Sequence, residues 1–77
     1  MITTMQTRAA RGLLNWTQKD LARNSGISGV TIRNYENGKT SPNLATKIVL
    51  QLTFEKHGVE FTPDGYGVRL RPPEDYQ

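Results

Sequence analysis

The sequence predicts a mainly α fold, in which a bundle of short helices is followed by a C-terminal β-hairpin. Apolar residues recur at helical spacing between short breakers as far as residue 58, whereas a period of two begins at Val59. The 77 residues include no cysteine, so a disulfide framework is excluded and helix packing must supply a small core. We expect a helical domain at 1–58, a hairpin at 59–71 and a flexible tail at 72–77.

The first helix is expected to end where Asn15 and Trp16 interrupt the helical pattern. Thr3 or Thr4 can cap its start, because a hydroxyl oxygen accepts one of the unpaired N–H groups there. Its buried face is predicted by apolar residues at every fourth position, namely Met5, Ala9 and Leu13.

The second and third helices are separated by a tight turn. Thr17 and Asp20 have the spacing of a capping box at the start of the second helix, and Gly26 can adopt the left-handed conformation that ends it. Ser28 caps the third helix, which Gly38 closes. The inner faces of the two helices are formed by Leu21, Ala22, Ile27, Ile32 and Tyr35.

The fourth helix is expected to start at Ser41–Pro42 or at Asn43, and to run to about His57. Its apolar residues cover most of the helix circumference: Leu44, Ala45, Ile48, Val49, Leu50, Leu52 and Phe54. Three short neighbouring helices cannot cover so much apolar surface, so the fourth helix is expected to pack on something more.

The hairpin is predicted from alternating strands at 59–62 and 68–71, joined by a turn cluster at 63–67. An isolated two-stranded hairpin is marginally stable in water, so it must dock on another surface. We expect two chains to pair through the fourth helix and the hairpin, with the contacts made by Leu50, Phe54, Val59, Phe61, Val68 and Leu70. The alternative is a hairpin that only covers the core of its own chain.

Charge is distributed unevenly along the sequence. Up to Gly58 eight basic residues face three acidic ones, a net charge of +5, and from Val59 onward two basic face four acidic, a net charge of −2. This distribution favours a polyanionic partner for the helical part. The longest apolar run, at 48–50, is too short to span a bilayer, and the first five residues do not form a secretion signal, so we expect a cytoplasmic protein without membrane contacts.

The segment from Gln18 to Tyr35, with its flanks, resembles the helix-turn-helix of the phage repressor/Cro family, often called the XRE family. The matching residues are Trp16–Gln18, Leu21–Ala22, Gly26–Ser28, Ile32, Tyr35–Lys39 and Pro42. The resemblance implies a lambda-repressor-like bundle of four or five short helices that binds operator DNA as a dimer, with the third helix in the major groove. This chain departs from the family in two ways. Gly29 and Val30 replace larger polar residues, and a hairpin replaces the fifth helix of many relatives.

The resemblance also implies a set of DNA-contacting residues on the third helix and beside it. They are Gln18, Ser28, Gly29, Val30, Thr31, Arg33, Asn34, Asn37, Lys39 and Thr40. The chemistry of three of them supports this role, because Asn34 can pair with adenine, Arg33 with guanine or a phosphate, and Val30 can touch a thymine methyl. Other cations are expected to be solvated, namely Arg8, Arg11 and Lys47.

No arrangement of residues typical of catalysis is found, so we expect neither an enzyme nor a cofactor. Glu36 is expected to cap a helix or to pair with a neighbour, and the single histidine, His57, makes no convincing metal site. The leading hypothesis is a transcriptional repressor that binds a palindromic operator as a homodimer. The alternative is a protein-interaction module, such as an antitoxin or a bridging factor, whose partner is a toxin or a regulator protein.

Overall fold

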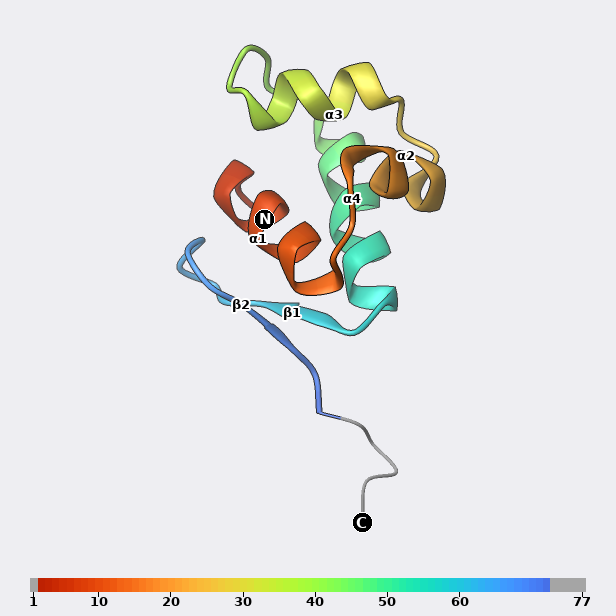
Figure 1. Ribbon diagram of the computed structural model, residues 1–77. Helices are drawn as coiled ribbons and strands as arrows, with labels where there is room; N and C mark the ends of the chain where they lie inside the picture. Colours follow the sequence, from red (N-terminus) through yellow and green to blue (C-terminus); the bar gives the residue numbers. More distant parts are fainter. Residues whose placement is uncertain (1, 73–77) are drawn as a thin grey trace.

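The computed structural model describes residues 2–72, which form four helices followed by a two-stranded antiparallel hairpin (Figure 1). The elements are α1 (Thr4–Leu14), α2 (Gln18–Ser25), α3 (Gly29–Glu36), α4 (Leu44–Lys56), β1 (Val59–Phe61) and β2 (Val68–Leu70). The predicted mainly α bundle with a C-terminal hairpin is confirmed. Helix α3 lies at one end of the molecule and the hairpin at the other, while residues 73–77 of the expected tail lie outside the described range.

Each helix begins at a residue whose side-chain oxygen accepts a backbone N–H of the first turn. At α2 the Thr17 hydroxyl accepts from the Asp20 N–H (3.0 Å), and the Asp20 carboxylate accepts from the Thr17 N–H (2.9 Å). Thr3 forms a similar box at α1, and Ser28 caps α3. Of the two starts expected for α4, the structure has Asn43 as the cap. These local side-chain bonds set the helix boundaries, because the N–H groups of a first turn lack helical partners.

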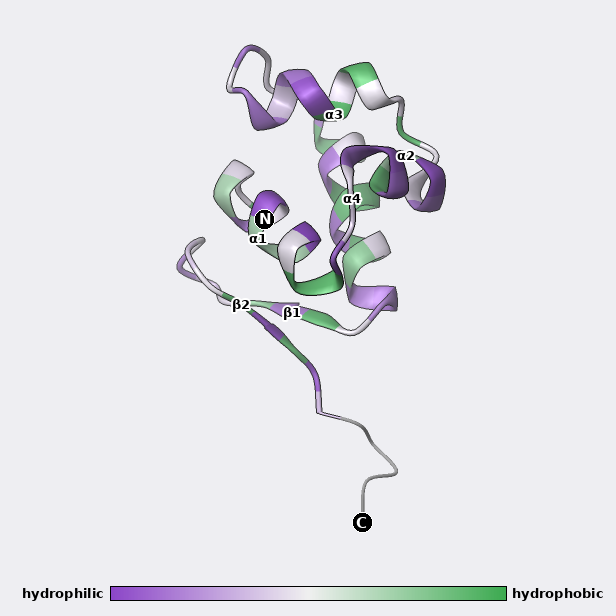
Figure 2. Ribbon diagram, viewed as in Figure 1, coloured by the Kyte–Doolittle hydropathy of each residue, from purple (hydrophilic) through white to green (hydrophobic). Residues whose placement is uncertain are grey.

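The core of the described residues draws on every helix and on β1. Trp16, between α1 and α2, packs against Phe54 of α4 with ring centroids 5.9 Å apart. The buried apolar residues are Ile2, Ala10, Leu21, Ile32, Tyr35, Leu50, Phe54 and Val59. Figure 2 shows hydrophobic residues along most of α4, which runs through the middle of the bundle.

The predicted buried face of α1 is wrong. Met5 and Leu13 are 48% and 39% exposed, and the buried side of the helix carries Gln6, Thr7 and Ala10 instead. Two of these are polar, and each is stabilised in the core by hydrogen bonds. The Gln6 amide donates to two hairpin carbonyls, and the Thr7 hydroxyl donates to the Thr3 carbonyl (3.0 Å). Apolar periodicity cannot reveal a buried face that is built from satisfied polar groups.

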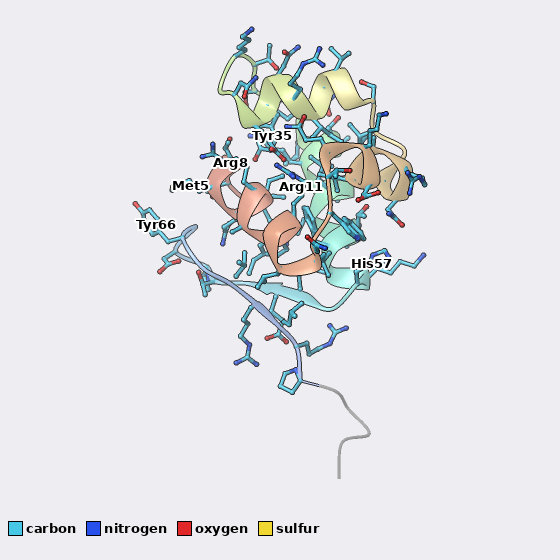
Figure 3. All side chains as sticks on the ribbon, viewed as in Figure 1. Met5, Arg8, Arg11, Tyr35, His57 and Tyr66 are labelled. Atoms are coloured by element: carbon cyan, nitrogen blue, oxygen red, sulfur yellow. The ribbon has the colours of Figure 1, made fainter. Side chains whose placement is uncertain are left out.

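The hairpin is attached to the start of α1. Val59 pairs with Leu70, and Phe61 pairs with Val68, so the four apolar side chains share one face as predicted. Gln6 Nε2 donates to the carbonyls of Thr62 (3.1 Å) and Gly67 (2.9 Å), which bracket the turn. The hairpin therefore closes the core of its own chain. Tyr66, at the tip of the turn, points away from the bundle (Figure 3).

Candidate nucleic-acid interface

Helices α2 and α3 are joined by a turn of residues 26–28. Gly26 has a φ of 77°, in the left-handed region where a Cβ is strained, and its N–H donates to the Ala22 carbonyl (2.9 Å). Leu21 of α2 and Ile32 of α3 are both fully buried, so the inner faces of the two helices are held together by the core. This arrangement confirms the predicted turn and leaves the opposite side of α3 facing outward.

The outer face of α3 carries small and polar groups. Gly29, Val30 and Arg33 are exposed, Val30 to 55%, and Asn34 is half-buried. No residue in the range 2–72 forms an ion pair with Arg33. The face therefore offers one cation, one amide and one small apolar group at the end of the molecule.

Ser28 and Thr31, which were also predicted to contact DNA, bond to each other in the structure. The Ser28 hydroxyl accepts from the Thr31 N–H (3.2 Å) and donates to the Thr31 hydroxyl (2.9 Å). Both side chains lie at the outward start of α3, where they stabilise the first turn. Each retains oxygen lone pairs that can accept a further hydrogen bond.

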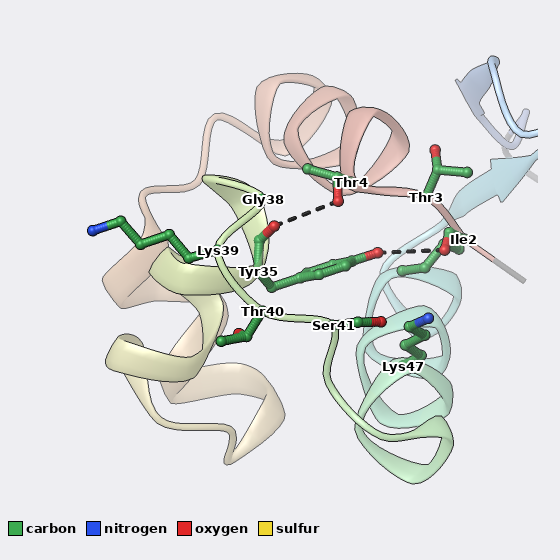
Figure 4. A pocket seen from close by; sticks show the side chains of 9 residues that line it. All are labelled: Ile2, Thr3, Thr4, Tyr35, Gly38, Lys39, Thr40, Ser41 and Lys47. Atoms are coloured by element: carbon green, nitrogen blue, oxygen red, sulfur yellow. Dashed lines mark hydrogen bonds between the residues drawn. The ribbon is translucent and has the colours of Figure 1, made fainter.

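The segment after α3 is exposed and tightly folded back on the helix. Asn37 is the last residue before a positive φ of 75° at Gly38, and the Lys39 N–H donates to the Asn34 carbonyl (2.9 Å). Lys39 and Thr40 line one side of a hollow of about 400 Å³ between α1, α3 and α4. In Figure 4 the Lys39 side chain extends away from the other labelled residues. The predicted residues Asn37, Lys39 and Thr40 thus lie beside the end of α3.

Gln18, at the start of α2, is half-buried and contacts α3. Its Nε2 donates to Glu36 Oε1 (3.1 Å), so the side chain that was expected beside the third helix lies there. The same carboxylate binds Arg11 of α1 through two hydrogen bonds, at 2.8 Å to Nε and 2.7 Å to the terminal nitrogen. The Glu36 carboxylate therefore joins α1, α2 and α3 at the C-terminal end of α3.

Arg11 was expected to be solvated, and this expectation is wrong. Its side chain is only 20% exposed, and the hydrogen bonds that it donates to the Glu36 carboxylate raise the pKa of Arg11 above its ordinary value. In Figure 3, Arg11 points from α1 into the space between the helices. No local pattern signals this pair, because 25 residues separate its members. The expectation that Glu36 pairs with a neighbour is confirmed.

The residues expected at a dimer interface are distributed between the core and the surface. Leu50, Phe54 and Val59 are fully buried within the single chain, whereas Leu70 is 49% exposed. Phe61 and Val68 are half-buried, and Phe61 packs against Phe54 with ring centroids 6.0 Å apart. The three buried side chains are covered by their own chain and present no surface to a second copy.

Two inwardly packed helices across a glycine turn, with a polar outer face on the second, define a helix-turn-helix protein of the DNA-binding class. Residues 8–48, more than half of the chain, match the helix-turn-helix family HTH_3. The chain therefore belongs to this family and is a DNA-binding regulator of the XRE type. HTH_3 is a DNA-binding regulatory family rather than an enzyme family.

No curated protein shows a significant match to the chain. Within residues 2–72, no helix is both long and apolar enough to cross a membrane. In the same range, no three acidic or histidine side chains gather closely enough to hold a metal ion.

Proposed function

We propose that this protein is a transcriptional repressor that binds a palindromic operator as a dimer, with α3 of each chain in the major groove. The observation that carries the proposal is the outer face of α3, where Arg33 and Val30 are exposed and Asn34 is half-buried. No large apolar side chain lies on this face, so it can approach base pairs closely. A helix of this kind fits the width of the major groove.

The side chains on this face have distinct preferences for bases. The Asn34 amide can donate to and accept from adenine, and the Arg33 guanidinium can donate two hydrogen bonds to guanine. Val30 offers a methyl contact to thymine. Together they support recognition of a short half-site rather than of duplex shape alone.

The flanks of α3 fit contacts with the phosphate backbone. Lys39 and Thr40 follow α3 and are exposed, and no ion pair engages Lys39 within the described part of the chain. Gln18 is a further candidate at the start of α2, although its amide nitrogen already donates a hydrogen bond to Glu36. Such contacts position a protein on DNA without reading its sequence.

The palindromic form of the proposed operator follows from the proposed dimer. A two-fold axis between two chains sets their recognition helices about 34 Å apart, which is one turn of DNA. A repressor then acts by covering the operator and so excluding the transcription machinery.

A protein-interaction module remains the second candidate, and exposed apolar side chains on α4 favour it. Leu44 and Leu52 are 60% and 57% exposed, and contiguous exposed apolar patches mark sites of interaction with other proteins. An antitoxin or a bridging factor would use such a surface for another protein. Its contacts with random duplex DNA would then show little dependence on salt.

Selection from a pool of random duplexes with the purified full chain tests the proposal. We expect the selected duplexes to share two inverted half-sites about one helical turn apart, and the affinity to fall steeply with salt. A duplex of the same composition in scrambled order is the control. A pool that does not converge, together with a flat salt dependence, would contradict DNA recognition. Repression is checked by placing the selected site between a promoter and a reporter gene.

A further inference from the structure

Helix α4 carries a continuous apolar surface that the described residues leave uncovered. Leu44, Ile48, Val49 and Leu52 are 60%, 42%, 37% and 57% exposed. We call this surface, together with the exposed Ala45, the α4 stripe. Its members recur at helical spacing from Leu44 to Leu52, so they form one face rather than scattered exposed positions.

The chain's own hairpin packs on a different side of α4. Leu50 and Phe54, which point away from the stripe, are fully buried, and Phe61 of β1 stacks edge-on against Phe54. The hairpin therefore completes the core without reaching the stripe.

The two sides of the stripe carry opposite charges at its C-terminal end. With about 100° between successive residues of a helix, Glu55 and Lys56 lie on opposite sides of Leu52. Glu55 accepts a hydrogen bond from Gln51 (3.1 Å), but neither Glu55 nor Lys56 forms an ion pair within residues 2–72. An acidic residue and a basic residue at the same level along the helix axis, one on each side of the stripe, can pair with the same two residues of a second copy.

We propose that the α4 stripe is the interface with a second copy of this chain, and that the two α4 helices pack parallel across a two-fold axis. In a parallel pair each flank meets the opposite flank of the other helix, so Glu55 of each copy faces Lys56 of the other. This ion pair therefore forms twice, once on each side of the two-fold axis. In an antiparallel pair like flanks meet, and Glu55 faces the uncharged start of the other α4. The two charges therefore favour a second copy of the same chain as the partner, with the two α4 helices running in the same direction.

A hollow beside the stripe fits the same arrangement. It has a volume of about 340 Å³, and its lining includes Val49, Leu52 and Lys56 as well as Asn24 of α2. Because it lies on the basic flank, it faces the acidic flank of the other copy. The carboxylate of Glu55 can enter there and reach the Lys56 ammonium.

The parallel direction also suits DNA binding, and this part of the argument rests on the proposed function. Helix α4 starts near the α3 end of the molecule and runs toward the hairpin (Figure 1). A two-fold axis along α4 therefore leaves both α3 helices at the same end of the dimer, as one duplex requires. An antiparallel pair would place them at opposite ends.

Sedimentation of the full chain without DNA tests the interface. We expect a dimer at tens of micromolar, and a dissociation constant raised at least about a hundredfold by Ile48→Glu or Leu52→Glu. Leu70→Glu is the matched control, because Leu70 is 49% exposed on the hairpin and should leave the dimer intact. Thermal unfolding confirms that each variant is folded.

A charge exchange tests the partner and the direction. Glu55→Lys and Lys56→Glu should each weaken the dimer by about three- to tenfold, and the double variant should restore it. A wild-type monomer, a dimer broken by Leu70→Glu alone, or a double variant without rescue would overturn the proposal. The proposed function is judged separately, by the selected duplexes. Inverted half-sites selected by a chain that is monomeric without DNA leave it standing, because the two copies then pair on the operator. A dimer without specific DNA binding contradicts the proposed function alone.

Discussion

Arg11 on α1 and Glu36 at the end of α3 form a bidentate ion pair, with nitrogen–oxygen distances of 2.8 and 2.7 Å. The Glu36 side chain is only 2% exposed, and Gln18 of α2 donates a third hydrogen bond to it. Arg11 also donates to the Trp16 carbonyl (3.0 Å). The pair thus connects α1, α2 and α3 beside the surface proposed to bind DNA, and it holds α3 in a defined orientation.

Replacing Glu36 by glutamine should destabilise the fold by about 3 kcal/mol, because the Arg11 charge is then left partly buried without a partner. Denaturant unfolding at a fixed protein concentration measures the change. Glu60→Gln is the control, since Glu60 pairs with Arg69 on the surface, where both side chains are more than 40% exposed. It should change stability by about 1 kcal/mol or less. Equal losses in the two variants would contradict a special role for the Arg11–Glu36 pair.

Acid should weaken the start of α2. The Thr17 N–H, helped by the Thr17 side chain and Arg23, holds the pKa of Asp20 below its ordinary value. A lowered pKa in the folded chain means that the Asp20 carboxylate stabilises the fold above its unfolded pKa of about 3.9. This contribution disappears as the pH falls through the folded pKa. Asp20→Asn should therefore melt at a lower temperature than the wild type near neutral pH. In acid, the melting temperatures of the two proteins should converge. Parallel pH profiles would exclude this contribution.

Arg33→Ala and Asn34→Ala should each weaken binding to the selected operator by about 1–3 kcal/mol, because each removes a proposed base contact. Neither side chain belongs to the core, so helix content should not change. Lys39→Ala is the comparison: it should weaken binding to all duplexes alike and reduce the salt slope by about 1. Binding titrations at several salt concentrations separate the two effects. Operator affinity that is unchanged in both α3 variants would refute the docking of this helix.

Gly29→Ala should stabilise the fold and weaken DNA binding. A Cβ at Gly29 meets no atom within 4 Å, so alanine is tolerated and raises helix stability by up to about 1 kcal/mol. The added methyl group faces the proposed duplex and should reduce operator affinity by about tenfold, or ~1.4 kcal/mol. Gly12→Ala provides the control, because Gly12 is exposed in the last turn of α1 and also has open space around it. It should stabilise the fold without affecting the affinity.

Much of the fold could be predicted because the signals are local. Thr17 and Asp20 are three residues apart, and Gly26 and Ser28 act on the backbone immediately around them. Such side chains determine where a helix begins and ends whatever surrounds them, because they satisfy N–H groups and tolerate conformations that others do not. The candidate site followed from the same local pattern, since the turn between α2 and α3 determines which side of α3 points outward.

The sequence by itself therefore determined the helices, the turn and the outward residues of α3. Only the tertiary structure decided the buried polar contacts and the side of α4 that is covered. Gln6 is buried because it meets hairpin carbonyls 56 and 61 residues away, and no local pattern encodes such a partner. Helix α4 is apolar almost all round, so periodicity could not separate Leu50, in the core, from Ile48, on the surface. Packing made that choice, because the apolar side that the other elements can reach becomes the core, and the opposite side stays exposed.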